Sequence, residues 1–429
     1  MHLRLRPARP LASLLESLQL QLAIRRRHPG AVAACLARRI PRRAAGPARA
    51  RVAYLAKPIF NDDIAAMQQF GGRLEYVPVP STDVRRVYYS FVSERYHHNH
   101  ASYYRDGNVA ERQQYFAFIR RVFEILRDQH DIAAVVSANY NYCWQQEVAR
   151  ACVELNLPLV VLHKEGVNLC ANHKDAVTEH ACSRFVGHVV LTYNQAVTTA
   201  LLNVGIEGLD AGHVQVVGVP RLDSYVRRPP AAGDTVAFFS FAPHVPLEQR
   251  PSGAAIEQRT RAFYQLPLHF AARHPQIRVV MKFKNSAAHR SLRDITIAQY
   301  GRRLPANLSM TSSGHPESII RGARAVASCN STTLLEGLLA GRRLITPDYE
   351  DVVAGGLADC FTAYPHMVTR AATLDAFERG VFGTGGSTAA DPALVDELMG
   401  RGDGRASERV EEAIAALIAR HSRAPIGAG

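Results

Sequence analysis

Short apolar runs alternate with amphipathic segments along most of the chain, and this alternation predicts the fold. Continuous Val, Ile and Leu runs are typical of strands buried on both faces of a parallel sheet. A first series of such strands is expected at 51–60, 73–80, 132–138, 157–163, 186–193 and 214–220. A second series is expected at 235–241, 277–283, 307–312, 325–329 and 343–347. Helical spacing of apolar residues predicts helices between them, at 111–129, 144–155, 194–204, 256–273, 316–322 and 333–340.

The two series are separated by the sequence RRPPAAGD at 227–234, whose composition is typical of a linker. Two α/β domains are therefore predicted, each a doubly wound parallel sheet, facing each other across a cleft. Four divisions are expected. They are a basic extension, amphipathic or disordered, a first α/β domain, a second α/β domain, and a C-terminal helix and tail: 1–50, 51–228, 229–395 and 396–429. Ligands of such sheets bind at the carboxyl ends of the strands.

The positive charge is concentrated at the start of the chain. Twelve arginines and one acid, Glu16, give residues 1–51 a net charge of +11, so only +2 of the total +13 belongs to residues 52–429. Nucleic acid is therefore not an expected partner. Five leucines recur there at helical spacing: Leu11, Leu14, Leu15, Leu18 and Leu22. A basic amphipathic helix on an anionic membrane surface is one interpretation; a disordered extension or an organelle presequence are the others.

Cysteine content and apolar run length bear on location. Seven cysteines form no C-x-x-C pair, which favours a reducing cytoplasmic compartment. No apolar run approaches the roughly 18 residues of a membrane span. We therefore expect a cytoplasmic protein, with peripheral attachment to the inner face of the membrane as an option.

Cofactor and metal motifs are sparse. The sequence has no P-loop, no dinucleotide fingerprint and no D-x-D after a strand, so no cofactor and no divalent metal are expected. One cluster has Cys and His pairs separated by only six residues, a spacing that gives zinc a low prior: Cys170, His173, His180 and Cys182. The aromatic, His-rich segment 82–110 is expected to be a loop, acting as an acceptor contact or a lid.

The stretch SCNSTTLLEGLLAG, residues 328–341, follows a predicted strand and opens a predicted helix. Thr333 and Glu336 have the spacing of a capping box, in which the glutamate reaches back to the helix start. Free amides at a helix N-terminus also suit phosphate. Local sequence leaves both interpretations open.

A longer segment, HPESIIRGARAVASCNSTTLLEGLLAGRRLITP at 315–347, resembles the donor-binding half of GT-B glycosyltransferases. The likeness is to the CDP-glycerol glycerophosphotransferase and surface (capsular) polysaccharide group, and more distantly to non-hydrolysing UDP-N-acetylglucosamine 2-epimerases. Arg343 stands where those families usually have proline. The resemblance implies that Asn330, Ser331 and Thr332 hold a donor diphosphate and that Glu336 holds ribose hydroxyls.

Other donor-side candidates are basic residues that follow predicted strands. Lys282 and Lys284 lie where the resembling families carry a phosphate-binding basic residue, and His244 follows the strand at 235–241. His315 opens the resembling segment and is a further donor-side candidate. Arg221 and Asp223, in a G-x-P-R-x-D element, could latch the domain boundary or form a structural turn.

Acceptor-side candidates follow strands of the first series. Glu165 or His163, in the sequence HKEG, is the expected base for the acceptor hydroxyl, with Lys164 beside them. Asp62 is a further acceptor-side candidate, and with Asp63 it is a weaker alternative base; either could instead cap the next helix.

Together these features predict a metal-independent transferase. It would move a sugar or polyol phosphate from a nucleotide-activated donor to a cell-surface glycan or lipid-linked acceptor. Two alternatives stay open: a nucleotide-sugar 2-epimerase on the same fold, and a non-catalytic membrane-associated scaffold.

Overall fold

The computed structural model describes most of the chain. The described residues are 11–42, 49–57, 60–97, 109–163, 184–229, 233–241, 253–353, 361–362, 364–383 and 392–423. Of the residues singled out in the sequence, Lys164, Glu165, His244 and the cluster Cys170–Cys182 lie outside these ranges.

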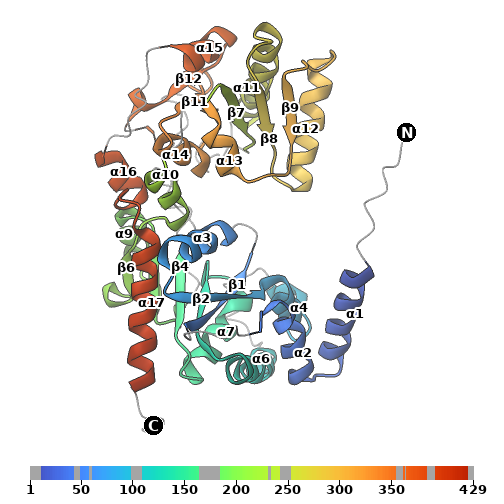
Figure 1. Ribbon diagram of the computed structural model, residues 1–429. Coiled ribbons are helices and arrows are strands. Elements are labelled where there is room, and N and C mark those ends of the chain that lie inside the picture. The colour runs from blue at the N-terminus through green and yellow to red at the C-terminus, as the bar shows by residue number, and fades with distance from the viewer. Residues whose placement is uncertain are drawn as a thin grey trace.

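Two six-stranded sheets, each parallel throughout, form the centres of two domains (Figure 1). The first sheet has the order β2-β1-β3-β4-β5-β6. Its strands are β1 Ala50–Ala56, β2 Leu74–Pro80, β3 Ile132–Ser137, β4 Leu159–His163, β5 Val189–Thr192 and β6 Val214–Val216. The second has the order β12-β11-β10-β7-β8-β9. Its strands are β7 Thr235–Phe239, β8 Val279–Lys282, β9 Leu308–Thr311, β10 Ala323–Ala327, β11 Arg343–Pro347 and β12 Thr369–Ala371.

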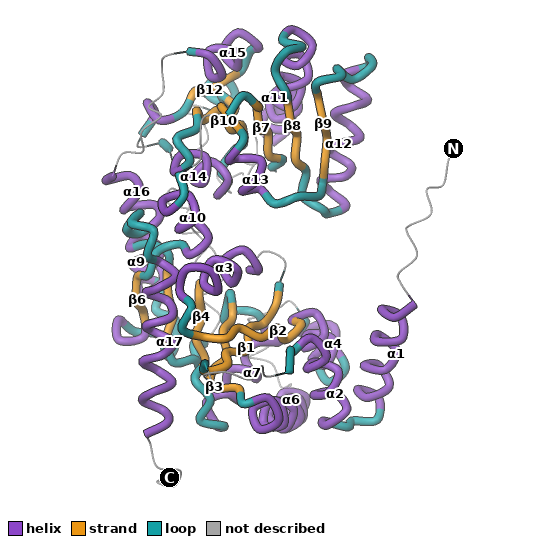
Figure 2. The backbone as a smooth tube through the Cα atoms, in the orientation of Figure 1, coloured by secondary structure: helices purple, strands orange, loops and turns teal. Residues whose placement is uncertain are grey.

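Each strand order reverses direction once, beside β1 in the first sheet and beside β7 in the second. Helices cover both faces, as Figure 2 shows. This is the doubly wound arrangement in both domains, and the predicted fold class, two such domains in a GT-B architecture, is confirmed.

The helices up to the end of the first domain are α1 Leu11–Arg25, α2 Pro29–Leu36, α3 Asn61–Ala66, α4 Ser81–Tyr89, α6 Val109–His130, α7 Cys143–Glu154, α9 Gln195–Asn203 and α10 Asp223–Arg227. A short 3-10 turn, η6 Pro220–Leu222, directly precedes α10. Those that follow are α11 Gly253–Arg273, α12 Ala287–Tyr300, α13 Pro316–Arg321, α14 Thr332–Leu339, α15 Leu374–Phe382, α16 Pro392–Met399 and α17 Ala406–Arg423.

The last two helices return to the first domain, along the left side of Figure 1. The Asp223 carboxylate accepts the first amides of α17, from Ala406 at 3.0 Å and Ser407 at 2.7 Å. Asn194 donates to the Leu398 carbonyl at 2.7 Å. Gly400, at φ +57°, lies so close that an added Cβ would be 2.2 Å from the Tyr193 carbonyl oxygen. Such close backbone contact fixes the C-terminal helices on the first domain.

The basic N-terminal segment is folded over residues 11–40. Leu20 and Ile24 of α1 and Val32 and Leu36 of α2 are buried in one apolar cluster with α4 and α6. These two helices therefore extend the core of the first domain.

One expectation about local structure was wrong. Residues 82–89, expected to belong to a loop over 82–110, form most of helix α4, because Val84, Val87 and Tyr88 recur at helical spacing and are buried. Helix α12 was not foreseen, although Ser286 caps it by accepting the His289 amide through its side chain.

We expect Leu36→Ala to lower the free energy of unfolding by about 2–5 kcal/mol, because it removes a fully buried side chain. Leu18→Ala in the neighbouring helix is the matched control, since Leu18 is exposed and should change stability by less than about 0.5 kcal/mol. Urea denaturation followed by circular dichroism measures both. Equal effects would show that α2 is not part of the core.

Candidate functional site

A cavity of about 150 Å³ lies between the two domains. Its lining comes from α3 and the turn after it in the first domain, from η6 and α10, and from α13 and α14 with the residue before α13 in the second: chiefly Asp62, Gln69, Arg221, Tyr225, His315, Glu317 and Glu336. A wider hollow of about 490 Å³ between α11 and α12 is lined by residues such as Glu257, Arg261 and Gln265. No candidate residue from the sequence lines it, so the inter-domain cavity is the candidate site.

Arg221 lies at the centre of a buried network beside this cavity. Its guanidinium Nη1 is 3.1 and 3.2 Å from the two Asp63 carboxylate oxygens, and its backbone N–H donates to Asp63 Oδ1 at 3.2 Å. The Tyr193 hydroxyl donates to Asp63 Oδ2 at 2.9 Å. On the other side, Arg221 Nε is 3.6 Å from Glu336 Oε1, and the Tyr225 hydroxyl donates to Glu336 Oε2 at 3.1 Å. Arg221, in η6, thus joins a carboxylate of each domain.

The electrostatics of this network follow from its burial. Asp63 is 0% and Glu336 is 7% exposed. Burial lowers the pKa of Arg221, but the charges of Asp63 and Glu336 outweigh it and hold that pKa above its ordinary value. Burial and the neighbouring carboxylates raise the pKa of both Tyr193 and Tyr225. Both hydroxyls therefore stay protonated and act as donors.

The structure decides how α14 is capped. Ser331 is the N-cap, and its hydroxyl accepts from the Thr333 amide at 3.4 Å. The capping box between Thr333 and Glu336 was a wrong interpretation: Thr333 lies inside the helix, and the Glu336 carboxylate meets Arg221 and Tyr225 instead. Asn330, Ser331 and Thr332 are all partly exposed at this helix start.

The basic candidates gather at the ends of β8 and β9. Lys282 Nζ donates to the Ser313 carbonyl at 3.3 Å, and burial lowers the pKa of Lys282 despite the attraction of Asp62. The Lys284 amide donates to Ser240 Oγ at 3.0 Å. Lys284 itself is exposed.

Sequence reasoning missed a pair beside these lysines. Ser240 Oγ is 2.8 Å from His289 Nδ1, and burial, helped by Lys284, lowers the pKa of His289. His289 belongs to α12, so recognising the Ser286 cap in the sequence could have found it.

Two candidates from opposite domains meet at the cavity. His315, at the N-cap position of α13, has Nδ1 3.3 Å from Oδ1 of Asp62 in α3. The His315 side chain is 77% exposed and that of Asp62 is 36% exposed, and such pairs contribute little to stability. Asp63 differs from its neighbour, because it is buried in the Arg221 pair.

The remaining acceptor-side candidate is less accessible. His163 ends β4 and is 3% exposed, with its ring 6.0 Å from the Tyr140 ring. A second feature of the same edge was not foreseen: Lys57 Nζ donates to Asn139 Oδ1 at 2.7 Å and lies 4.2 Å from the centre of the Tyr142 ring. The signal was a polar, aromatic run directly after a buried strand.

Within the described ranges, no group of three or more His, Cys, Asp or Glu residues could hold a metal ion. Among the same residues, no helix is both long and apolar enough to cross a membrane.

No protein-family model matches this chain, and no curated protein matches it by sequence. Solved structures of similar fold include UDP-GlcNAc 2-epimerase from Methanocaldococcus jannaschii, at TM-score 0.49 and 10% identity, covering 86% of this chain and 100% of that one. The Neisseria meningitidis UDP-GlcNAc 2-epimerase bound to UDP-GlcNAc has TM-score 0.48 and 9% identity, with 86% and 100% covered. A UDP-forming trehalose-phosphate synthase from Burkholderia xenovorans has TM-score 0.43 and 13% identity, with 88% and 100% covered. The likeness is distant and concerns the fold alone.

We expect Arg221→Met to lower the free energy of unfolding by about 3–5 kcal/mol, because it leaves two buried carboxylates without their cation. Arg221→Lys keeps the charge but not the fork of donors, so its loss should be smaller. Arg120→Met, which breaks the more exposed pair with Glu154, is the control and should cost at most about 1 kcal/mol. Denaturant unfolding measures all three, and a loss for Arg221→Met no greater than the control would contradict the network's structural role.

Proposed function

We propose that the protein is a metal-independent transferase of the GT-B type, which moves a sugar or polyol phosphate from a nucleotide-activated donor to a glycan or lipid-linked acceptor. The observation that carries this proposal is the arrangement around the inter-domain cavity. Basic and helix-terminal groups of the second domain face a carboxylate of the first, His315 meeting Asp62 at 3.3 Å.

The second domain supplies what a departing nucleotide phosphate needs. The start of α14 offers the Ser331 and Thr332 hydroxyls, and β8 ends in Lys282, with Lys284 two residues later. Positive charge and backbone amides stabilise the negative charge that develops on a leaving phosphate. Asn330, His244 and His315 are proposed as further donor contacts.

Glu336 is proposed to accept ribose hydroxyls. Its carboxylate lines the cavity while Tyr225 and Arg221 hold it in place.

The first domain is proposed to hold the acceptor and take its proton. Glu165 and His163 are the proposed alternatives for the base, with Lys164 and Asp62 contacting the acceptor. The burial of His163 supports a carboxylate in this role, because a general base must reach the hydroxyl it deprotonates. The proposed location of the protein is the inner face of the membrane, where lipid-linked acceptors lie.

A nucleotide-sugar epimerase is a second candidate. Acids and a histidine converge on one small cavity, with Asp62, His315 and Glu336 in its lining. Such groups could move a proton on a bound sugar as well as activate an acceptor.

We expect one nucleotide of the panel CMP, CDP, UDP and GDP to raise the melting temperature, since a ligand of the native state stabilises it. Lys282→Ala should lower the affinity for that nucleotide about tenfold, or about 1.4 kcal/mol, because it removes a cation that contacts the phosphate. Arg302→Ala is the matched control. Arg302 is an exposed cation that precedes β9, so it lies at the opposite edge of the sheet from Lys282, which ends the parallel strand β8. No shift with any nucleotide would favour the scaffold alternative.

Transfer and epimerisation are separated by omitting the acceptor. We expect UDP-N-acetylglucosamine incubated with the protein alone to keep its configuration at C2, as read by proton NMR. Accumulation of the epimer would refute the transferase proposal and establish the epimerase, since only a transferase needs a second substrate.

A further inference from the structure

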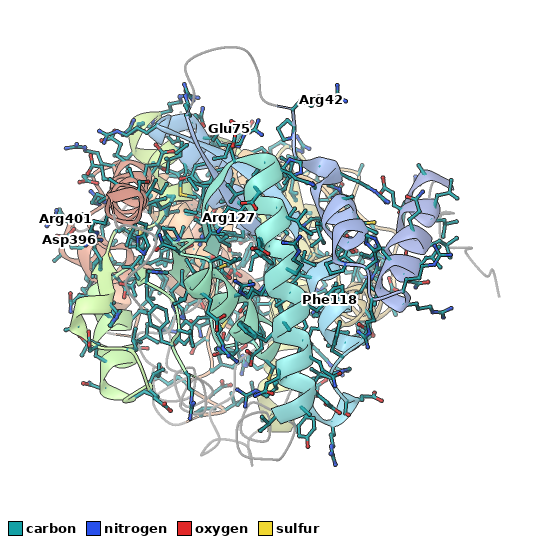
Figure 3. The ribbon with its side chains drawn as sticks, turned by 90° about the horizontal axis from the view of Figure 1, so that it is seen from below. Arg42, Glu75, Phe118, Arg127, Asp396 and Arg401 are labelled. Atoms are coloured by element: carbon teal, nitrogen blue, oxygen red, sulfur yellow. The ribbon has the colours of Figure 1, made fainter. Side chains whose placement is uncertain are left out.

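Helix α1 is apolar on two opposite sides. Its inner side, with Leu20, Ala23 and Ile24, is buried against the first domain. Its outer side carries four leucines that are between 44% and 59% exposed: Leu14, Leu15, Leu18 and Leu22. At about 100° per residue these four share one face of the helix. Figure 3 shows α1 at the margin of the molecule, with its outer side open.

This exposure is a patch and not a scatter. The other exposed large apolar side chains of the described chain belong to separate elements: Val109, Tyr142, Val153 and Phe382. Single exposed apolar residues are ordinary, whereas several together on one helix face mark an interaction surface.

The charge around the patch is positive. Arg25 and Arg26 are exposed at the end of the same helix. Residues 11–42 contain six arginines and one acid, Glu16, a net charge of +5. Behind α1, a cavity of about 330 Å³ is lined by two of these arginines, Arg38 and Arg39, and by Arg86, against two carboxylates, Glu16 and Asp83.

These features favour one occupant over another. A second copy of the chain would bring like-charged arginine clusters together, and four leucines are few for an interface that typically buries about 800 Å² per partner. A bilayer of anionic lipids complements both features, because it takes apolar side chains and attracts basic ones.

We propose that the outer face of α1 docks on an anionic lipid bilayer, with its four leucines among the acyl chains and Arg25 and Arg26 at the headgroups. The helix lies on the surface: its 15 residues span about 22 Å, less than the roughly 30 Å hydrocarbon core. The docking surface goes beyond the proposed transferase activity, and it depends only on α1 and its surroundings.

The test is sedimentation of the full chain with vesicles. We expect binding to vesicles of phosphatidylglycerol and phosphatidylcholine in equal parts, weakening as salt rises, and little binding to phosphatidylcholine alone. The double variant Leu15→Ser, Leu18→Ser should lower the partition coefficient about tenfold or more. Arg25→Gln with Arg26→Gln should lower it on anionic vesicles and weaken its salt dependence.

The matched control is Val109→Ser with Val153→Ser, which removes two exposed apolar side chains from elsewhere in the first domain. It should bind vesicles like the unaltered protein. All variants should keep the same melting temperature and the same nucleotide-induced shift, so a loss of lipid binding is separable from a failure of the donor site.

Three outcomes would overturn the proposal. The first is an unaltered protein that stays in the supernatant with anionic vesicles. The second is equal losses for the leucine variant and its control. The third is a dimer in analytical ultracentrifugation that the leucine variant converts to a monomer, which would make a second copy the occupant of this face.

Discussion

The relative position of the two domains depends on one buried cation. Arg221, in η6 near the end of the first domain, lies between Asp63 of that domain and Glu336 of the second. Buried carboxylates are costly unless a cation and hydrogen bonds compensate them, so both carboxylates require Arg221 in this place. Tyr193 and Tyr225 each donate one further hydrogen bond, to Asp63 and to Glu336. An alternative placement of the domains would leave charge buried and unpaired.

The same interaction connects stability to the proposed chemistry. Glu336 is aimed at the cavity because Arg221 and Tyr225 hold its two oxygens, and not because of anything within α14 itself. Asp62, one residue before Asp63, is carried on the same short helix to within 3.3 Å of His315. The contact that fixes the domains therefore also sets the distance between donor-side and acceptor-side groups.

The sequence was sufficient for the architecture and for which strand ends carry polar groups. Buried parallel strands are continuous apolar runs, so the described strands other than β12 could be located from these runs. Strand β12 was missed, because it has only three residues, Thr369–Ala371. The partners of Glu336 could not, because a capping box is a local pattern, while Tyr225 is 111 positions from Glu336 along the chain. Helices α4 and α12 were missed for different reasons: polar and aromatic residues mask the helical spacing of α4, and the Ser286 cap that opens α12 was not recognised.

For the N-terminal helices, too, the sequence pattern predicted the element but not its packing. The leucine and arginine pattern indicated an amphipathic helix, but not that α1 has a second apolar side that packs on the core. A helix already folded and docked loses little conformational freedom on meeting another surface, so less of its apolar contact energy is spent on ordering. Leu20 and Ile24 fix the helix, and Leu15 and Leu18 are left for a partner. Because α1 is packed on the first domain, a partner bound to α1 also holds that domain, which carries Asp62 and His163.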